Sequence, residues 1–275
     1  MNSISVYSFT RPNKAKNFGD DLSLSMCEYA SGKSVVWENP KYADMYAVGS
    51  LLQIFKSRKR QIKLPLQRAL KRKKRLVIWG TGVIKDMPLH MPPTTVLAVR
   101  GPLTANALGL KTTVPFGDPG LLVSDILAAP KKIGKIGIVP HYVDKTHPVV
   151  AEAGKNDRFM IIDVEDDWTN AVSRIAQCDL ILSSSLHGLI VADAYSIPNQ
   201  WLEFSNQVVG NGFKFQDYVD GIGRSSMKRV EVVSLNDIAK AVGMAQMSGP
   251  SLGDAQLRNI KDDLKRVLHV HYQNN

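Results

Sequence analysis

Residues 178–198 read CDLILSSSLHGLIVADAYSIP, and this stretch decides the fold. The apolar run at 180–183 predicts a buried strand, and residues 187–195 predict an apolar helix. Three serines connect the two elements. A buried strand that runs directly into an apolar helix is the repeating unit of a parallel sheet covered by helices. The stretch therefore predicts an α/β fold.

The same alternation continues along the rest of the chain. The predicted strands span residues 4–9, 45–48, 76–79, 95–99, 135–139, 159–163, 180–183 and 199–204. The predicted helices span residues 20–30, 50–70, 102–108, 118–127, 168–177, 187–195, 236–244 and 254–269. This order of elements predicts βα units and parallel sheets.

Residues 128–134 read AAPKKIG, which is typical of a boundary between domains because proline, lysines and glycine interrupt the alternation. We therefore expect an N-terminal Rossmann-like domain at 1–129 and a C-terminal one at 130–253. Residues 254–275 are expected to form a helix that packs back on the N-terminal domain. Parallel sheets bind ligands beyond the carboxyl ends of their strands, so two facing domains would hold the site in the cleft between them.

The 275 residues include 35 Lys and Arg against 25 Asp and Glu, a formal charge of +10. Residues 56–75 hold eleven of the basic residues and none of the acidic ones, which leaves 24 basic against 25 acidic residues elsewhere. The excess charge therefore belongs to one segment, which we call the basic segment (residues 56–75).

The basic segment allows more than one partner. Dense Lys and Arg bind phosphates without sequence preference, but only Phe55 stands at its edge for base stacking and no nucleic-acid motif accompanies it. We therefore expect no nucleic-acid partner. Apolar residues among the cations, such as Ile62 and Leu66, would instead suit the surface of an anionic membrane. A solvated basic helix or loop is the alternative.

The chain has two cysteines, Cys27 and Cys178, without metal-ligand spacing, which favours a reducing compartment. Its first residues do not resemble a secretory signal, and no apolar run approaches the roughly 18–20 residues of a membrane span. A cytoplasmic protein is expected, with the basic segment as a possible peripheral contact on the inner face of the cytoplasmic membrane.

The serine-rich loop of the opening stretch is the first candidate site. The hydroxyls of Ser184 and Ser185 and the amides of Leu186, His187 and Gly188 would surround an anion at the positive end of the helix dipole. His187 would lie beside that anion. A serine cap with a structural histidine is the alternative.

Arg100 follows the strand at 95–99, where a guanidinium could bind a carboxylate or phosphate through two parallel hydrogen bonds. A surface salt bridge is the alternative. Gly80 and Gly82 follow the strand at 76–79 and allow close approach of a ligand or only a tight turn. A dinucleotide fingerprint would need glycine at Lys85, so NAD or FAD is not supported.

Two loop carboxylates, Asp20 and Asp118, could accept a proton from a hydroxyl nucleophile, and both could equally be helix caps. Asn17 precedes Asp20 in the same loop. His141 follows the strand at 135–139 on the cleft side.

These segments together resemble the polysaccharide pyruvyltransferase family. The resemblance rests on seven motifs in the family's order over residues 17–218: NFGDD at 17–21, WGTG at 79–82, VRGPLT at 99–104, GDPGLL at 117–122, IVPHY at 138–142, SSSLHG at 183–188 and GFKFQDY at 212–218. Gly120 replaces the alanine expected in the family's Asp-Pro-Ala pattern.

The resemblance implies a two-domain fold similar to GT-B glycosyltransferases. It also implies transfer of the enolpyruvyl unit of phosphoenolpyruvate (PEP) to two hydroxyls of one sugar, which forms a pyruvate ketal and releases phosphate. The acceptor would be a polysaccharide or lipid-linked oligosaccharide precursor. PEP is then a co-substrate, and no metal or redox cofactor is expected.

The chemistry implied by this family assigns roles to the candidate residues. His187 would be the acid or would orient PEP, with the amides beside it as a cradle for the anion. Arg100 and Lys214 would supply positive charge, and Asp20 or Asp118 would be the base. His141, Asn17, Gly80 and Gly82 would be further residues of the cleft.

A GT-B glycosyltransferase with a nucleotide-sugar donor would share this architecture. Such an enzyme needs a carboxylate for the ribose, for which Glu203 is the one candidate.

Overall fold

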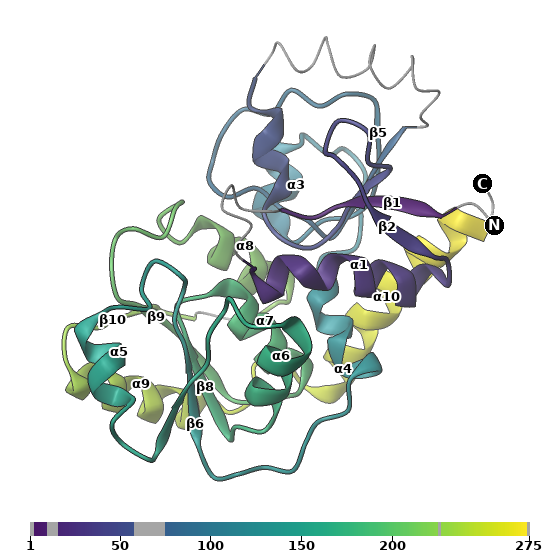
Figure 1. Cartoon of the computed structure of the whole chain (residues 1–275). Helices are drawn as coiled ribbons and strands as arrows, with labels where there is room; N and C mark the ends of the chain where they lie inside the picture. Colours follow the sequence, from purple (N-terminus) through teal and green to yellow (C-terminus); the bar gives the residue numbers. More distant parts are fainter. Residues whose placement is uncertain (1–2, 10–15, 58–74, 225–226, 274–275) are drawn as a thin grey trace.

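The computed structural model describes residues 3–9, 16–57, 75–224 and 227–273, which form two α/β domains, one above the other in Figure 1. Each domain contains a sheet of five strands within the described residues, and all neighbouring strands are parallel. The prediction of two parallel-sheet α/β domains is confirmed.

The N-terminal sheet has the strand order β2-β1-β3-β4-β5. Its strands are β1 (Ile4–Tyr7), β2 (Val35–Trp37), β3 (Met45–Tyr46), β4 (Leu76–Trp79) and β5 (Thr94–Ala98). The helices of this half are α1 (Phe18–Ser31), η1 (Leu51–Phe55), α3 (Pro102–Ala107), η2 (Pro119–Leu122) and α4 (Val123–Ile126).

The C-terminal sheet has the strand order β10-β9-β8-β6-β7. Its strands are β6 (Ile136–Val139), β7 (Phe159–Ile161), β8 (Leu180–Ser183), β9 (Asn199–Glu203) and β10 (Val230–Glu231). The helices are α5 (Pro148–Ala153), α6 (Trp168–Ala176), α7 (Leu186–Ala194), α8 (Phe213–Gly221), α9 (Leu235–Ser248) and α10 (Asp254–Gln273).

All eight predicted strands are present, and four elements were missed. β2 has only three residues, two of them exposed, and β10 has only two residues, so neither forms a long apolar run. α5 has only six residues, while α8 begins after a glycine and mixes aromatic with acidic residues. The helix predicted at 50–70 is the short 3-10 helix η1 in its first part, and residues 58–74 lie outside the described residues.

The opening stretch folds as predicted into β8 and α7. Every residue of α7 is buried, which explains why the helix has no polar face. The helix belongs to a hydrophobic core that it shares with residues of α1, α6 and α10. α1 lies between the two sheets in Figure 1, and the amide of Phe18 at its start donates to the carbonyl of Val164, 2.9 Å away in the other half of the chain.

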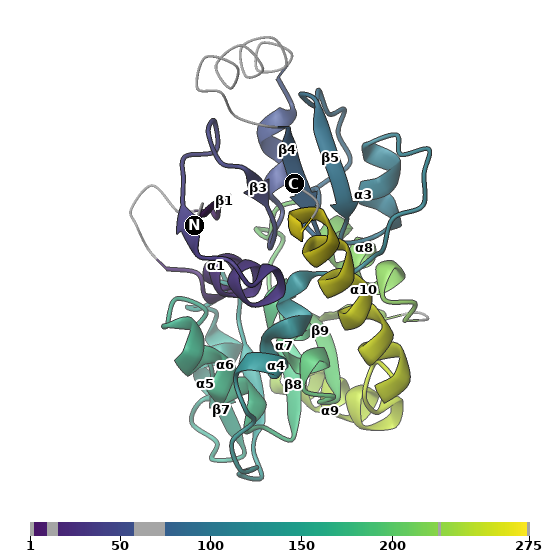
Figure 2. The same ribbon diagram turned by 90° about the vertical axis from the view of Figure 1, so that its right-hand side faces the viewer.

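The last helix, α10, leaves the C-terminal domain and runs along the N-terminal one, as Figure 2 shows. Leu264 and Leu268 are fully buried there, and the indole nitrogen of Trp79 donates to the Leu264 carbonyl at 3.0 Å. The two halves of the chain are therefore joined by α1, by α7 and by α10. No helix in the described part of the chain is long and apolar enough to cross a membrane.

Candidate active site

The amino-terminal ends of α7 and α1 meet at His187 and Gly19. A Cβ atom added to Gly19 would lie 1.9 Å from Nδ1 of His187, so only glycine allows this approach. The imidazole also contacts the ring of Phe18 edge-on, with centroids 6.4 Å apart. The helices that follow β1 and β8 are therefore in direct contact at His187, beyond the carboxyl ends of the two sheets.

His187 is buried, and its Nε2 atom has no hydrogen-bond partner among the described residues. Burial, with smaller contributions from Lys214, Arg100 and His141, lowers the pKa of the imidazole to about 3. The ring is therefore neutral at pH 7. Of the two roles expected for His187, this protonation state favours the orienting one, because a neutral imidazole with a free Nε2 can form a hydrogen bond to an incoming group.

The loop before α7 is held by Ser183, which sequence reasoning did not single out. Its hydroxyl donates to the carbonyls of Val139 and Ser185, at 2.9 and 2.7 Å, and accepts from the Ser185 amide at 3.0 Å. Ser185 is the N-cap residue of α7, but its side chain makes no capping bond. The alternative of a serine hydroxyl that caps this helix is therefore wrong for Ser185.

Two of the three expected cradle amides are at the open end of α7. The first N–H groups of a helix have no partner within the helix, and Leu186 and His187 supply them here. The Gly188 amide instead donates to the Ser185 carbonyl at 3.2 Å. Gly188 is needed for space, because a Cβ atom there would lie 2.3 Å from the Ser183 hydroxyl.

Asp144 is a buried site residue that the sequence reasoning missed. Its carboxylate accepts from the hydroxyl of Ser184 at 2.7 Å and from that of Ser205 at 2.6 Å. The Ser184 hydroxyl in turn accepts from the amide of His141 at 2.8 Å. Asp144 thus connects the loops after β6, β8 and β9. The signal was its position five residues after β6, in the same loop as His141.

Lys214 on α8 belongs to the same cluster. Burial and the charge of Arg100 lower its pKa to about 8, and the carboxylates of Asp20 and Asp144 act in the opposite direction. The ammonium is therefore the main form at pH 7. Lys214 is close enough to interact electrostatically with groups from both domains, including His187.

Asp20 lies in the first turn of α1 and is nearly buried. Asn17, and not Asp20, is the N-cap residue of α1: its side-chain oxygen accepts from the Gly19 amide at 3.3 Å. Its side-chain nitrogen donates to Asp20 Oδ2 at 2.8 Å. Oδ1 points toward Gly49, where a Cβ atom would lie 2.7 Å from it. The base role of Asp20 stays a prediction.

The structure revises the role of Arg100. Its side chain is fully buried and forms an ion pair with Asp217 on α8, with both Nε and Nη2 at 3.0 Å from Oδ2. Nη1 donates to the Ser50 hydroxyl at 2.8 Å, and Nη2 also donates to the Val83 carbonyl at 2.6 Å. A guanidinium that is buried and engaged in this way cannot also grip a ligand. Arg100 does form a salt bridge, but the expectation of a surface one is wrong, because both side chains are fully buried.

The glycines after β4 serve packing around this arginine. A Cβ atom on Gly82 would lie 2.5 Å from the Arg100 guanidinium, and one on Gly80 would lie 2.2 Å from Pro119. Gly80 also has a φ of +78°, which favours glycine. Both residues are explained without a ligand.

Asp118 is a helix cap, the alternative considered for it. It is fully buried, its Oδ1 accepts from the Gly120 amide at 2.9 Å, and its Oδ2 has no hydrogen-bond partner among the described residues. Burial raises its pKa to about 6. Because no part of Asp118 is exposed, Asp20 is the better placed of the two candidate bases.

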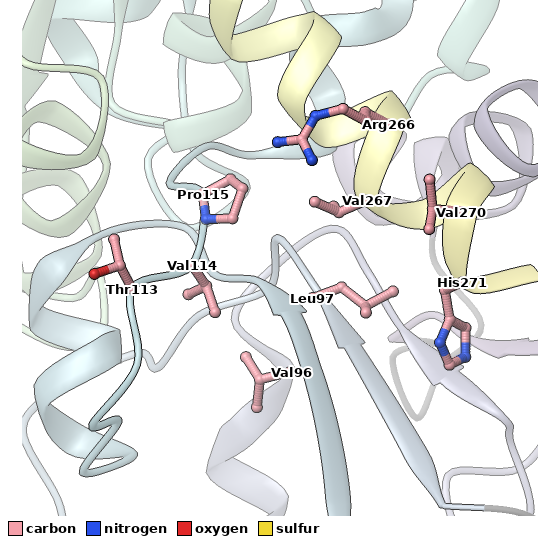
Figure 3. Close-up of a pocket in the computed structure, with 9 residues that line it drawn as sticks. All are labelled: Val96, Leu97, Thr113, Val114, Pro115, Arg266, Val267, Val270 and His271. Atoms are coloured by element: carbon pink, nitrogen blue, oxygen red, sulfur yellow. The ribbon is translucent and has the colours of Figure 1, made fainter.

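A hollow of about 540 Å³ lies elsewhere, between β5 with its following segment and α10. Figure 3 shows it lined mainly by apolar side chains, with Arg266 and His271 on the helix side. None of the residues of the His187 cluster lines it. Within the described ranges, no three His, Cys, Asp or Glu side chains form a group that could hold a metal ion.

Comparison with known proteins agrees with these features. Residues 3–205 match the sequence model of a family described as polysaccharide pyruvyl transferase. The succinoglycan biosynthesis protein ExoV of Rhizobium meliloti (strain 1021) is 29% identical over 265 residues, which cover 90% of this chain and 77% of that protein. An uncharacterized protein of Acanthamoeba polyphaga mimivirus is 32% identical over 183 residues, which cover 60% of this chain and 64% of that protein.

Among solved structures, the UDP-GlcNAc 2-epimerase from Methanocaldococcus jannaschii matches 98% of this chain and 100% of its own, with a TM-score of 0.52 and 12% sequence identity. At this identity the likeness concerns the fold alone.

Proposed function

Because this chain belongs to the polysaccharide pyruvyl transferase family, we propose that it transfers the enolpyruvyl unit of PEP to two hydroxyls of one sugar and releases phosphate. The family makes the protein a transferase with a polysaccharide-related acceptor. The relative named for succinoglycan biosynthesis supports a polysaccharide, or a lipid-linked precursor of one, as the acceptor.

The choice of PEP as the donor rests on one observation. The buried Nε2 atom of His187, which has no hydrogen-bond partner among the described residues, lies at the amino-terminal end of α7 and close to Lys214. PEP is a compact anion with a carboxylate and a phosphate. Binding it would supply an acceptor for Nε2 of His187 and for the amides of Leu186 and His187. The ammonium of Lys214 would balance its charge.

The protonation states of His187 and Lys214 support the following sequence of steps. Asp20 takes the proton from the first sugar hydroxyl, whose oxygen bonds to C2 of PEP. C3 gains a proton at the same stage, and Lys214 is the group of the cluster that holds one at pH 7, since His187 is neutral. The bond between C2 and the phosphate oxygen then breaks. The second hydroxyl bonds to C2 and closes the ketal, and its proton leaves with the phosphate.

The test is release of phosphate from PEP in the presence of candidate glycans, with the mass gain of the glycan as a second readout. His187→Ala and Lys214→Ala are each expected to lower the rate by about 10²-fold or more, in the range of a lost general acid or base. Lys240→Ala, on the exposed side of α9, is the matched control. Phosphate release that is unchanged in both site variants would overturn the assignment.

A nucleotide-sugar glycosyltransferase is the second candidate, and the fold alone does not distinguish the two. Its predicted ribose ligand, Glu203, forms an ion pair with Arg229 at 3.0 Å. Thermal-shift measurements with PEP, UDP and GDP separate these functions: PEP alone is expected to raise the melting temperature.

We also propose that the basic segment brings the enzyme to an anionic membrane, where lipid-linked acceptors are found. Residues 58–74 lie outside the described residues, so this proposal rests on their charge. Sedimentation with anionic liposomes tests it. Charge reversal at residues 71–75 is expected to abolish binding, and unchanged binding would exclude the segment as the membrane contact.

A further inference from the structure

The carboxyl end of β2 presents an unusually exposed tryptophan. Trp37 is the last residue of this strand and is 50% exposed, while Trp79 and Trp201 are buried. Val36 beside it is 47% exposed and Phe9, after β1, is 39% exposed. Tryptophan is enriched at binding surfaces because its ring offers a large apolar face.

The indole is held in one position. Its Nε1 donates to the carbonyl of Ser8 at 3.2 Å, so the polar atom of the ring is used within the protein. The backbone after Trp37 stays bonded to β1, since the amide of Glu38 donates to the Val6 carbonyl at 2.9 Å. What the ring offers to a ligand is therefore its apolar face.

The turn after Trp37 is also ordered before any ligand binds. The Asn39 carbonyl accepts from the amides of Tyr42 and Ala43, at 2.8 and 2.9 Å. The Tyr46 hydroxyl, on a buried side chain, donates to the Pro40 carbonyl at 2.6 Å. This order lowers the entropy cost of binding. We call Trp37, Glu38, Asn39 and Lys41 the β2 platform.

The β2 platform lies on the same edge of the sheet as Asp20. Val6 pairs with Trp37 on one side and with Met45 on the other, so these two residues are separated by two strand spacings, roughly 10 Å. Gly49, which approaches Asp20, follows Met45 by four residues. Trp37 therefore lies within roughly 20 Å of Asp20, a distance that an extended oligosaccharide of a few units covers.

We propose that the β2 platform binds the acceptor glycan at a sugar several units away from the one that receives pyruvate. A pyranose ring presents a face of C–H groups, which an aromatic ring removes from water, and an edge of hydroxyls. The platform offers both kinds of partner: the Trp37 face, and the carboxylate, amide and ammonium of Glu38, Asn39 and Lys41. The inference rests on the proposed function, because it takes the acceptor to be a glycan.

The composition of the platform favours a glycan over a protein or a second copy of this chain. Three of its four members are polar, and Glu38 and Lys41 carry opposite charges. A stable dimer interface would need a larger and more apolar surface. The consequence is a preference for length: a monosaccharide that fills the site at Asp20 does not reach Trp37.

The test is binding to an array of mono- to octasaccharide fragments of microbial exopolysaccharides, with and without PEP. The wild-type chain is expected to bind fragments of three or more units. Trp37→Ala should weaken that binding about tenfold or more, equal to about 1.4 kcal/mol. Trp37→Phe should retain most of it because the aromatic face remains.

Tyr29→Ala is the matched control, since Tyr29 is an aromatic residue on α1 with a similar exposed fraction, 40%. Its binding should equal that of the wild type. The proposal would be overturned if Trp37→Ala bound the fragments as well as the wild type, or if the wild type did not bind them. It would also be overturned if light scattering showed a dimer of the wild type that only Trp37→Ala dissociates.

The two proposals fail in different ways. Binding through Trp37 without any phosphate release from PEP would overturn the transfer reaction and leave the platform. Phosphate release with the same KM for long glycans in Trp37→Ala and wild type would overturn the platform and leave the reaction.

Discussion

His187 has a buried Nε2 atom for which the described part of the chain supplies no hydrogen-bond partner, and its ring contacts the start of α1. A buried nitrogen that lacks a hydrogen bond destabilises the free protein. Binding an anion removes this penalty. The same atom can therefore add to the affinity for the proposed donor although it weakens the empty site.

Gly19→Ala tests the contact at this histidine. The new Cβ atom would lie 1.9 Å from Nδ1 of His187, so the ring must move away from the end of α7. We expect the thermal shift produced by PEP to disappear while the protein still folds, because alanine suits a helix better than glycine.

Gly243→Ala in α9 is the matched control, since no atom lies within 4 Å of its added Cβ atom. This variant should keep the PEP response and gain roughly 0.5–1 kcal/mol in the free energy of unfolding. If Gly19→Ala kept a normal PEP shift, the position of His187 would not matter for donor binding.

The variant Asp118→Asn is expected to change how the free energy of unfolding depends on pH. Burial raises the pKa of this carboxyl from its ordinary value of 3.8 to about 6, so the folded protein holds the proton more tightly than the unfolded chain. The stabilisation is complete below about pH 4 and is lost as the pH rises through about 6. Asparagine stays neutral throughout.

The free energy of unfolding of Asp118→Asn, measured in urea, should therefore rise relative to the wild type between pH 4 and 7, by about 2 kcal/mol. A constant difference across this range would show that the pKa of Asp118 is not raised.

At the scale of elements, α8 connects the two domains and carries a site residue. Asp217 accepts from Arg100 and also from the amide and hydroxyl of Thr104, at 2.9 and 2.6 Å, both in the N-terminal domain. On the other side, Phe215 stacks on Trp201 with ring centroids 4.4 Å apart. Lys214 directly precedes Phe215 and lies three residues before Asp217. Its position is therefore determined by contacts with both domains.

Asp217→Ala should lower the free energy of unfolding by about 3–5 kcal/mol, because it leaves the Arg100 guanidinium buried without its charged partner. The double variant Arg100→Met with Asp217→Leu should lose less, since no buried charge remains.

Asp263→Ala is the control. It removes an ion pair between side chains that are 62% and 51% exposed and should lower the free energy of unfolding by less than about 1 kcal/mol. An Asp217→Ala loss as small as this would contradict the assignment of Arg100 to the structural pair.

At the scale of the whole molecule, one hydrophobic core includes residues of both domains. α10 contributes Leu257, Leu264 and Leu268 to this core. The helix starts beside the C-terminal domain and then covers the N-terminal one. The domains are therefore expected to unfold together.

Leu264→Ala should destabilise the protein by about 2–5 kcal/mol and keep a single transition in calorimetry. Val270→Ala, at a half-exposed position of the same helix, should change stability by less than about 0.5 kcal/mol. Two separate transitions in either variant would show that the domains are independent.

Much of this protein follows from its sequence alone. The eight predicted strands were local apolar runs, and residues 187–195 already indicated an apolar helix. The place of His187 after β8 followed from the rule that ligands bind at the carboxyl ends of parallel strands. These features depend on neighbours in the chain, which is why local patterns were sufficient to predict them.

The tertiary structure decided which charged groups are available to a ligand. Arg100 and Asp217 are 117 residues apart, and their pairing depends on how α8 packs against the other domain. The same packing sets Lys214 among charges of both domains. Burial and electrostatic interactions act through space. No local pattern of residues could therefore have shown that Arg100 is used within the fold while Lys214 stays a candidate for the site.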